Sequence, residues 1–310
     1  MEEIVWSGEK AIRLRNHAYE ALILTGIGAN CISFRHVPSG AEFLRTPPDA
    51  GTLRAEPNVY GLPLLFPPNR IGDGSYVFQG RQYTFLINEP ERHNHIHGLL
   101  SQMPFHITGE GRFEYRATPE SPYPGFPHAF TVIREYKLTD DGFSHRVVFR
   151  NDSDAGFALG TGIHAAFHLP FYPGDDPLAY RLKIPAEREW VLDDRRKLPT
   201  GVIRDKTPLL YALKKGELIP DSQPLSVLIQ CGPGPLVLGG PSGSLRCERD
   251  GYGFVMLWNG GGGKGFVCPE PQTWATNAPN LQLPWFETGM RCLMPGEEAS
   301  FTLRLHWESD

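Results

Sequence analysis

The fold is decided by residues 130–149, which read FTVIREYKLTDDGFSHRVVF. Polar and apolar residues alternate over Phe130 to Leu138 and again over Ser144 to Phe149, as in strands that bury one face. The turn residues at 140–142, Asp-Asp-Gly, connect the two runs. We therefore predict two antiparallel neighbours in one sheet, with the alternating run Arg112 to Arg116 as a further strand of the same sheet.

Glycine and proline punctuate the rest of the chain. The 34 glycines and 29 prolines are scattered and not gathered in one linker, and no long amphipathic helical pattern stands out. Apolar runs between turn residues predict hairpins at 19–36 and 76–86, strands at 225–230, 236–238, 254–258 and 300–307, and one short helix at 207–216. The pattern predicts an all-β fold, a large antiparallel β-sandwich, and one domain over residues 1–310.

Composition narrows the class of partner. The formal net charge is -5 and no basic run is present, so we expect no nucleic acid partner and favour a small neutral or polar ligand. The five cysteines are odd in number and contain no C-x-x-C pair, which argues against a disulfide framework and a zinc ribbon. The amino terminus lacks a signal-like pattern and no apolar stretch is long enough to span a membrane. We expect a soluble, cytoplasmic protein with reduced thiols and no membrane partner.

Three alternating histidines, His93, His95 and His97, are candidates for chemistry. If the run is extended, all three imidazoles lie on one face of a strand. The same alternation is also typical of the solvent-exposed face of an ordinary strand. His97 differs because Gly98 follows it, and glycine beside a strand residue often marks a bulge or a place where a ligand approaches the backbone. A metal site and a metal-free pocket in which one histidine acts as acid or donor both remain open.

Prolines restrict two other segments that carry polar residues. Residues 60–70 contain three prolines, which forbid a helix interior or a central strand, so this rigid segment must deliver Asn69 and Arg70 to a fixed place. Glu270 lies between two prolines at the end of an apolar strand. It is either held in one orientation, as a general base should be, or is a surface carboxylate in a proline-rich loop.

Two further segments contain residues that local sequence leaves ambiguous. His164 and His168 interrupt the apolar segment 157–171, where a hydrogen-bonded core histidine is the common alternative to a catalyst. Asn259 and the four glycines after it are expected to form a flexible connection.

Several of these motifs together resemble the aldose 1-epimerase family, the galactose mutarotase-like proteins. In chain order they are Asn69-Arg70-Ile71 with Asp73-Gly74, Asn94-His95-Ile96-His97-Gly98, His164-Ala165-Ala166-Phe167-His168-Leu169, Leu198-Pro199-Thr200-Gly201, Glu270-Pro271 and Leu293-Met294-Pro295-Gly296-Glu297. The resemblance implies the galactose mutarotase-like supersandwich fold. It also implies interconversion of the α and β anomers of an aldose through the open-chain form, with no metal and no organic cofactor.

The resemblance also assigns roles to individual residues. Glu270 matches the base that removes the proton from the C1 hydroxyl, and His164 matches the acid that protonates the ring oxygen. His97 matches the second histidine, which hydrogen-bonds the sugar near the reacting centre. The residues expected to bind the sugar itself are Arg70, Asn69, Gln272 and Asp221, the last in place of the family's sugar-binding aspartate.

The function expected is therefore that of an isomerase, an aldose 1-epimerase acting on an aldohexose or a modified aldose. Three alternatives stay open. One is a carbohydrate-binding or sensor protein without catalysis on the same fold. Another is a sugar-phosphate epimerase, for which residues 195–197, Arg-Arg-Lys, are the one compact basic cluster. The third is a metalloenzyme that uses His93, His95 or His97 with His164 or Glu270.

Overall fold

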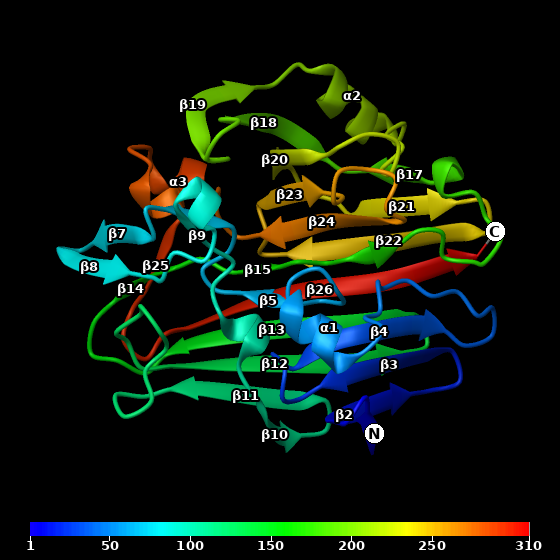
Figure 1. The fold of residues 1–310 in the computed structure, drawn as a ribbon, viewed down its shortest axis with the longest axis horizontal. Coiled ribbons are helices and arrows are strands. Elements are labelled where there is room, and N and C mark those ends of the chain that lie inside the picture. Colours follow the sequence, from blue (N-terminus) through cyan, green and yellow to red (C-terminus); the bar gives the residue numbers. More distant parts are fainter. Residues whose placement is uncertain (310) are drawn as a thin grey trace.

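The computed structural model describes residues 1–309, and two large antiparallel sheets dominate it (Figure 1). The first sheet has eight strands in the order β10-β11-β12-β13-β26-β22-β21-β17. Its strands are His106–Gly109 (β10), Arg112–Ala117 (β11), Phe130–Thr139 (β12), Gly142–Asn151 (β13), Glu298–Ser309 (β26), Gly243–Asp250 (β22), Leu236–Gly240 (β21) and Arg181–Lys183 (β17). The predicted pairing across the turn at 140–142 is confirmed, with Phe130 opposite Asn151 at one end of the ladder.

The second large sheet carries the residues of interest. Its order is β19-β18-β20-β23-β24-β15-β5, and β16 also pairs with β24. Its strands are Pro199–Arg204 (β19), Ala186–Leu192 (β18), Ser226–Cys231 (β20), Phe254–Trp258 (β23), Phe266–Gln272 (β24), Gly162–Ile163 (β15), Leu64–Leu65 (β5) and Phe167–His168 (β16). The proline-rich segment 60–70 thus contributes only the two-residue edge strand β5 to this sheet.

Smaller elements complete the structure. A four-stranded sheet contains Glu2–Trp6 (β1), Glu9–Arg15 (β2), Tyr19–Leu24 (β3) and Asn30–His36 (β4). Three strand pairs join Phe157–Leu159 (β14) with Arg291–Leu293 (β25), Arg70–Gly72 (β6) with Asn94–Ile96 (β9), and Ser75–Phe78 (β7) with Arg81–Thr84 (β8). Short helices span Ala50–Ala55 (α1), Pro208–Lys215 (α2) and Trp285–Thr288 (α3), and 3₁₀ turns span Pro90–Arg92 (η1), Leu100–Gln102 (η2), Pro177–Ala179 (η3) and Ala278–Asn280 (η4).

The predicted helix at 207–216 shows how local signals set its ends. Thr207 caps α2 because its hydroxyl accepts a hydrogen bond from the amide of Leu210, and Gly216 ends it in the left-handed conformation. The hairpins predicted at 19–36 and 76–86 are also confirmed as β3–β4 and β7–β8.

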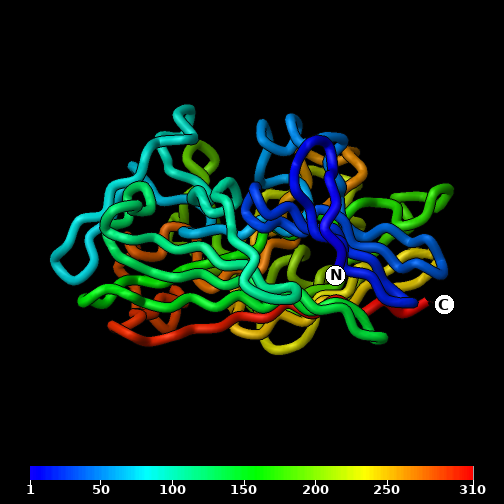
Figure 2. Tube along the Cα trace, turned by 90° about the horizontal axis from the view of Figure 1, so that it is seen from below, coloured from blue at the N-terminus to red at the C-terminus, as the bar shows by residue number. Residues whose placement is uncertain are grey.

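One hydrophobic core joins the two large sheets into a sandwich. It contains Phe149 of β13 and Leu303 of β26 from the first sheet, together with Val255 of β23 and Val267 of β24 from the second. Turned by 90°, the molecule shows β26 (red) along one side, while loops from the first third of the chain (blue to cyan) rise on the other (Figure 2). The all-β sandwich prediction is confirmed. Within residues 1–309, no helix combines the length and apolar character that crossing a bilayer requires.

Candidate active site

A cleft of about 900 Å³ opens beside β24 of the second sheet. Five of the residues predicted for the site line it, namely Asn69, Arg70, His97, His164 and Glu270. They come from segments that are far apart in the sequence, so the fold brings them together.

Glu270 reaches the cleft from the interior of β24, a strand in which every residue is buried. Sequence reasoning placed it at the end of a strand, but it lies within the ladder, opposite Met256 of β23. On the other side, β24 pairs with β15 near one end and β16 near the other. The ladder is interrupted between them, opposite Pro269 and Pro271, which have no amide hydrogen to donate. The surface-carboxylate alternative for Glu270 is therefore wrong.

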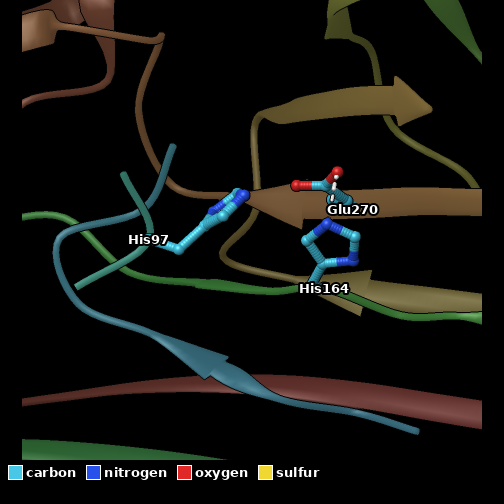
Figure 3. Close-up of side chains that lie close together, drawn as sticks. All are labelled: His97, His164 and Glu270. Atoms are coloured by element: carbon cyan, nitrogen blue, oxygen red, sulfur yellow. Dashed lines mark ion pairs between the residues drawn. The ribbon is translucent and has the colours of Figure 1, made fainter. Parts of the chain in front are cut away.

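His164 occupies that interruption, between β15 and β16. Its backbone amide donates to the carbonyl of Pro63 at 3.0 Å, and that of Ala166 donates to Gly61 at 2.9 Å. This connection therefore pairs with the proline-rich segment and not with β24. Nε2 of His164 lies 3.1 Å from Oε1 of Glu270, as the dashed line in Figure 3 marks. His164 is buried, as expected for a core histidine, yet it also lines the cleft.

His97 enters the cleft from a tight backbone turn after β9. Both His97 and Gly98 adopt left-handed conformations, with φ of 65° and 64°. A Cβ atom on Gly98 would lie 1.8 Å from the carbonyl oxygen of Phe66, so only glycine fits there. The group that approaches Gly98 closely is the protein's own backbone at Phe66, so the glycine is explained without a ligand. The His97 ring meets that of His164 edge-on, with centroids 5.0 Å apart (Figure 3).

Burial dominates the electrostatics of the three side chains. It raises the pKa of Glu270 to about 8, although Arg70 and a hydrogen bond from Gln272 act in the opposite direction. Burial lowers the pKa of His164 to about 3. Burial, and then repulsion by His164 and Arg70, holds the pKa of His97 well below its usual value. At neutral pH the Glu270–His164 contact therefore carries one transferable proton, on the carboxyl group.

A carboxylate that sequence reasoning missed holds Arg70. The guanidinium donates two hydrogen bonds of 2.8 Å to the two oxygens of Glu89, and Arg92 and Asn94 contact the same carboxylate. Burial alone would raise the pKa of Glu89, but the hydrogen bonds from Arg70 and Asn94 outweigh it and lower that pKa. Arg70 is therefore a positioned donor whose charge is largely compensated within the protein.

Asn69 and Gln272 form a short chain that ends on Glu270. The side-chain amide of Gln272 donates to Oε2 of Glu270 at 3.1 Å, and that of Asn69 donates to Gln272 at 3.5 Å. Gln272 is fully buried and lies behind Glu270, not in the lining of the cleft. Its contact orients the carboxyl group, which is a different role from the sugar contact expected for it.

His93 and His95 do not share a site with His97, so the expectation of three imidazoles on one face is wrong. His93 is exposed, has a φ of 54° and contacts Asp73. His95 is buried, stacks on Phe85 and contacts the carbonyl of Leu86. The extended run is only three residues long, because left-handed residues end it on both sides.

Asp221 binds the backbone of the glycine-rich loop and does not line the cleft. Its two carboxylate oxygens accept hydrogen bonds of 3.0 Å from the amides of Lys264 and Gly265. Asn259, at the start of the loop, is fully buried and donates to the carbonyls of Pro220 and Gln223. The expected sugar contact of Asp221 is thus not made from this position, and the loop expected to be a flexible connection is hydrogen-bonded at both ends.

Among the other lining residues, Arg45, Trp258 and Lys264 were not predicted for the site from the sequence. The Trp258 ring packs edge-on against His164, with centroids 5.8 Å apart. Trp258 was identified only as the end of an apolar strand, and Lys264 only as part of a glycine-rich loop. No local pattern distinguishes them, because their importance comes from what packs beside them.

The three central side chains suit proton transfer, and they also have the chemistry of metal ligands. One ligand atom from each of His97, His164 and Glu270 lies within 4.8 Å of the others. Two imidazoles and a carboxylate are a known ligand set for zinc. Of the histidines named for a metal site, His93 and His95 lie outside this cluster.

Comparison with known proteins agrees with this fold. Residues 10–306 match the model of the family described as aldose 1-epimerase. A galactose mutarotase-like protein from Clostridium acetobutylicum superposes with a TM-score of 0.93 at 30% identity, covering 100% of this chain and 98% of that one. The GalM/aldose epimerase homologue from C. elegans has a TM-score of 0.77 at 17% identity, covering 96% and 98% of the two chains, and its likeness concerns the fold.

A curated relative matches only in part. YihR of Escherichia coli strain K12, an uncharacterized protein, is 28% identical over 130 residues, which are 41% of this chain and 41% of YihR. The match therefore spans less than half of that relative's length. The family model covers nearly the whole chain, and a solved structure at 30% identity covers all of it. The chain belongs to the aldose 1-epimerase family.

Proposed function

We propose that the protein is an aldose 1-epimerase that opens and closes the ring of an aldose by acid–base catalysis. The observation that carries the proposal is the buried contact of 3.1 Å between Glu270 and His164 in a cleft that Arg70 also lines. The two oxygens that lose or gain a proton in the reaction, the C1 hydroxyl oxygen and the ring oxygen, are bonded to the same carbon. An adjacent base and acid can therefore reach both at once.

Ring opening begins from the tautomer in which the shared proton lies on His164. The Glu270 carboxylate takes the proton of the C1 hydroxyl, the bond from C1 to the ring oxygen breaks, and His164 protonates that oxygen. The products are the open-chain aldehyde, a neutral His164 and a protonated Glu270. After rotation about the bond from C1 to C2, the same two groups reverse the transfers and close the ring on the other face.

The remaining polar residues hold the sugar during this cycle. Arg70 supplies planar donors, and Glu89 fixes their direction. The His97 ring, held neutral at physiological pH by burial, can hydrogen-bond a sugar oxygen beside the reacting carbon. Gln272 keeps the Glu270 carboxyl in one orientation.

Exchange NMR of equilibrated α- and β-anomers of glucose and galactose tests the reaction. Wild-type protein is expected to accelerate anomer exchange. Glu270→Gln should lower kcat/KM by on the order of 10² to 10⁴. Glu91→Gln, at an exposed carboxylate outside the cleft, is the matched control and should leave the rate unchanged. Undiminished activity of Glu270→Gln would remove that residue from the base role.

Two alternatives give different results in the same assay. A sugar-binding protein without catalysis would bind the sugar and accelerate nothing. A metal-dependent enzyme, which the cluster of His97, His164 and Glu270 permits, would lose activity when chelator-treated protein without a histidine tag is assayed. Full activity of that metal-free sample would eliminate the metal-dependent alternative.

A further inference from the structure

The cleft is strongly cationic, although the whole chain has a formal net charge of -5. Its lining contains five cationic side chains, Arg45, Arg70, Arg92, Lys197 and Lys264, and two carboxyl groups, Glu56 and Glu270. Because Glu270 is largely protonated at neutral pH, Glu56 is the one full negative charge in the lining. A concentration of positive charge against the overall balance of the chain indicates an anionic ligand.

Three of the five cations are already compensated by the protein. Arg70 and Arg92 both contact the carboxylate of Glu89, and Lys197 lies 3.2 Å from Asp194. Two cations differ. Within residues 1–309, neither Arg45 nor Lys264 forms an ion pair, and these two side chains therefore define the part of the cleft whose cations are not ion-paired. We call it the cationic end.

Arg45 is fixed in place without using most of its donors. Its guanidinium carbon lies 4.2 Å from the ring centroids of both Tyr60 and Phe266, and one of its nitrogens donates to the carbonyl of Val59 at 3.0 Å. A guanidinium has five N–H groups in a planar fork. The two aromatic rings therefore hold a planar, permanently charged donor in one orientation at the cleft wall.

Lys264 is presented at the same end by the glycine-rich loop. Asp221 accepts hydrogen bonds from the amides of Lys264 and Gly265, which fixes the backbone on both sides of the lysine side chain. Lys264 precedes Phe266, the ring on which Arg45 stacks, by two residues. Asp221 thus serves to position a cation of the cleft, and its own charge is satisfied by backbone amides.

The cationic end is separated from the reacting centre along β24. Phe266 and Glu270 are four residues apart and face the same side of β24, so their Cα atoms are separated by ~13 Å. The Trp258 ring spans this interval, with its centroid 5.6 Å from that of Phe266 and 5.8 Å from that of His164. A sugar with C1 at Glu270 would extend over Trp258 toward Arg45.

We propose that the substrate is an aldose with an anionic group at the end remote from C1, bound by Arg45 and Lys264. This inference rests on the proposed anomerase function and names its substrate class. The anionic group is a phosphate, a sulfonate or a carboxylate, each of which offers negatively charged oxygens to Arg45 and Lys264. The compact cluster at 195–197 that sequence analysis offered for a phosphate is a weaker candidate, because Arg196 is bound to Asp73 and Lys197 to Asp194.

Exchange NMR with four sugars tests the substrate class on wild-type protein: glucose, glucose 6-phosphate, the 6-sulfonate of glucose and glucuronate. At least one anionic sugar should exceed glucose in kcat/KM by on the order of tenfold or more, and this advantage should shrink as ionic strength rises. The sugar with the highest kcat/KM shows whether the anionic group is a phosphate, a sulfonate or a carboxylate. Equal or lower kcat/KM for all three anions, with glucose accelerated, would overturn the inference and leave the proposed function intact. Acceleration of no sugar would instead overturn the proposed function.

Charge-removing variants locate the anion site. Lys264→Gln and Arg45→Gln should each lower the ratio of kcat/KM for the anionic sugar to that for glucose by on the order of tenfold. Arg45→Lys should restore part of that loss. Lys214→Gln and Arg195→Gln remove equal charges from exposed positions outside the cleft lining and should leave the ratio unchanged.

A second measurement distinguishes loss of the anion site from misfolding, which is a concern for Arg45 variants because Arg45 packs between two rings. Binding of the preferred anionic sugar to Glu270→Gln, measured by calorimetry, should weaken about tenfold when Lys264→Gln is added. Lys264 is exposed, so this variant should keep the thermal unfolding midpoint of its parent. Unchanged ratios and unchanged binding in the Arg45 and Lys264 variants would exclude the cationic end as the anion site.

Discussion

At the scale of single residues, the chemistry depends on a pair of buried groups that share one proton. Glu270 and His164 are almost completely buried, and burial moves their pKa values in opposite directions, to about 8 and about 3. Between these values the pair has the same proton count, whichever of the two groups carries the proton. Ring opening and ring closure both conserve that count, so the pair is ready for either direction over a wide pH range.

The pH profile of kcat/KM should reflect this shared proton. We expect a plateau with an alkaline limb near pH 8, where the pair loses its proton, and an acid limb near pH 3, where it gains a second one. The profile should be flat through 4.5 and 6.5, the ordinary values for glutamate and histidine. The measurement is exchange NMR from pH 2.5 to 9, with the uncatalysed rate subtracted. An inflection near pH 6.5 would contradict a neutral His164.

The same pKa shifts make the active site a source of instability. The pKa of Glu270 is raised on folding from 4.5 to about 8, so the folded state keeps a proton that the unfolded state releases, and stability falls as pH rises through this window. His164 has the opposite sign, because its folded pKa is lowered and stability falls as pH drops below 6.5. The two penalties are smallest together between pH 4.5 and 6.5.

Glu270→Gln should therefore stabilise the protein in a pH-dependent way. At pH 7 the free energy of unfolding should rise by about 3 kcal/mol, because glutamine has no proton to release on unfolding. Near pH 4.5 the gain should vanish. Denaturant unfolding at both pH values measures this, with Glu91→Gln as a control that changes neither. A gain of equal size at both pH values would show that the Glu270 pKa is not raised.

At the scale of elements, the site exists because one strand contains prolines and one turn has no room for a side chain. Pro269 and Pro271 interrupt the ladder on one side of β24, and the connection that carries His164 fills the interruption. His97 is directed into the cleft by the left-handed turn that it forms with Gly98. The prolines of β24 and the turn at Gly98 are local features of the chain. Each nevertheless packs against a segment from another part of the sequence.

Gly98→Ala tests the turn. The new Cβ would overlap the carbonyl oxygen of Phe66, so we expect destabilisation of about 3 kcal/mol or more and a loss of activity as His97 shifts. Gly80→Ala is the matched control, because Gly80 has a similar φ of 77° with nothing within 4 Å of an added Cβ. It should cost only about 1 kcal/mol in chemical unfolding. Equal losses in the two variants would show that conformation alone, and not the contact with Phe66, requires the glycine.

At the scale of the whole molecule, we propose that the chain is one domain. A single hydrophobic core contains residues from Ile12 to Trp307 and both large sheets, and the carboxy-terminal strand β26 lies between β13 and β22 in the first sheet. A core that is shared this widely makes the packing of each large sheet depend on the other.

We therefore expect one cooperative unfolding transition. Far-ultraviolet circular dichroism, which follows the sheets, and tryptophan fluorescence should give coincident midpoints in denaturant, and calorimetric and van't Hoff enthalpies should agree. Titration with the preferred sugar should raise the midpoint of the whole transition, since the ligand binds only the folded state. Two separated transitions would contradict a single domain.

By itself the sequence determined several of the strands and most of the chemical groups of the proposed site. Alternation over 130–149 and the turn residues within it require an antiparallel pair, because a period of two places one face of each strand in the core. The order of the motifs around Arg70, His97, His164 and Glu270 identified the family before any contact was known. These signals depend on neighbouring residues or on order along the chain, so they can be read from the sequence alone.

Only the tertiary structure decided which of these residues work together. Alternation suggested that His93, His95 and His97 share a face, but left-handed residues at His93 and His97 direct the three rings to different places. The burial that moves the Glu270 pKa, and the cleft lining that includes both Arg45 and Lys264, come from segments distant in sequence. Desolvation and charge act through space, and periodicity along the chain does not encode distances between its separate segments.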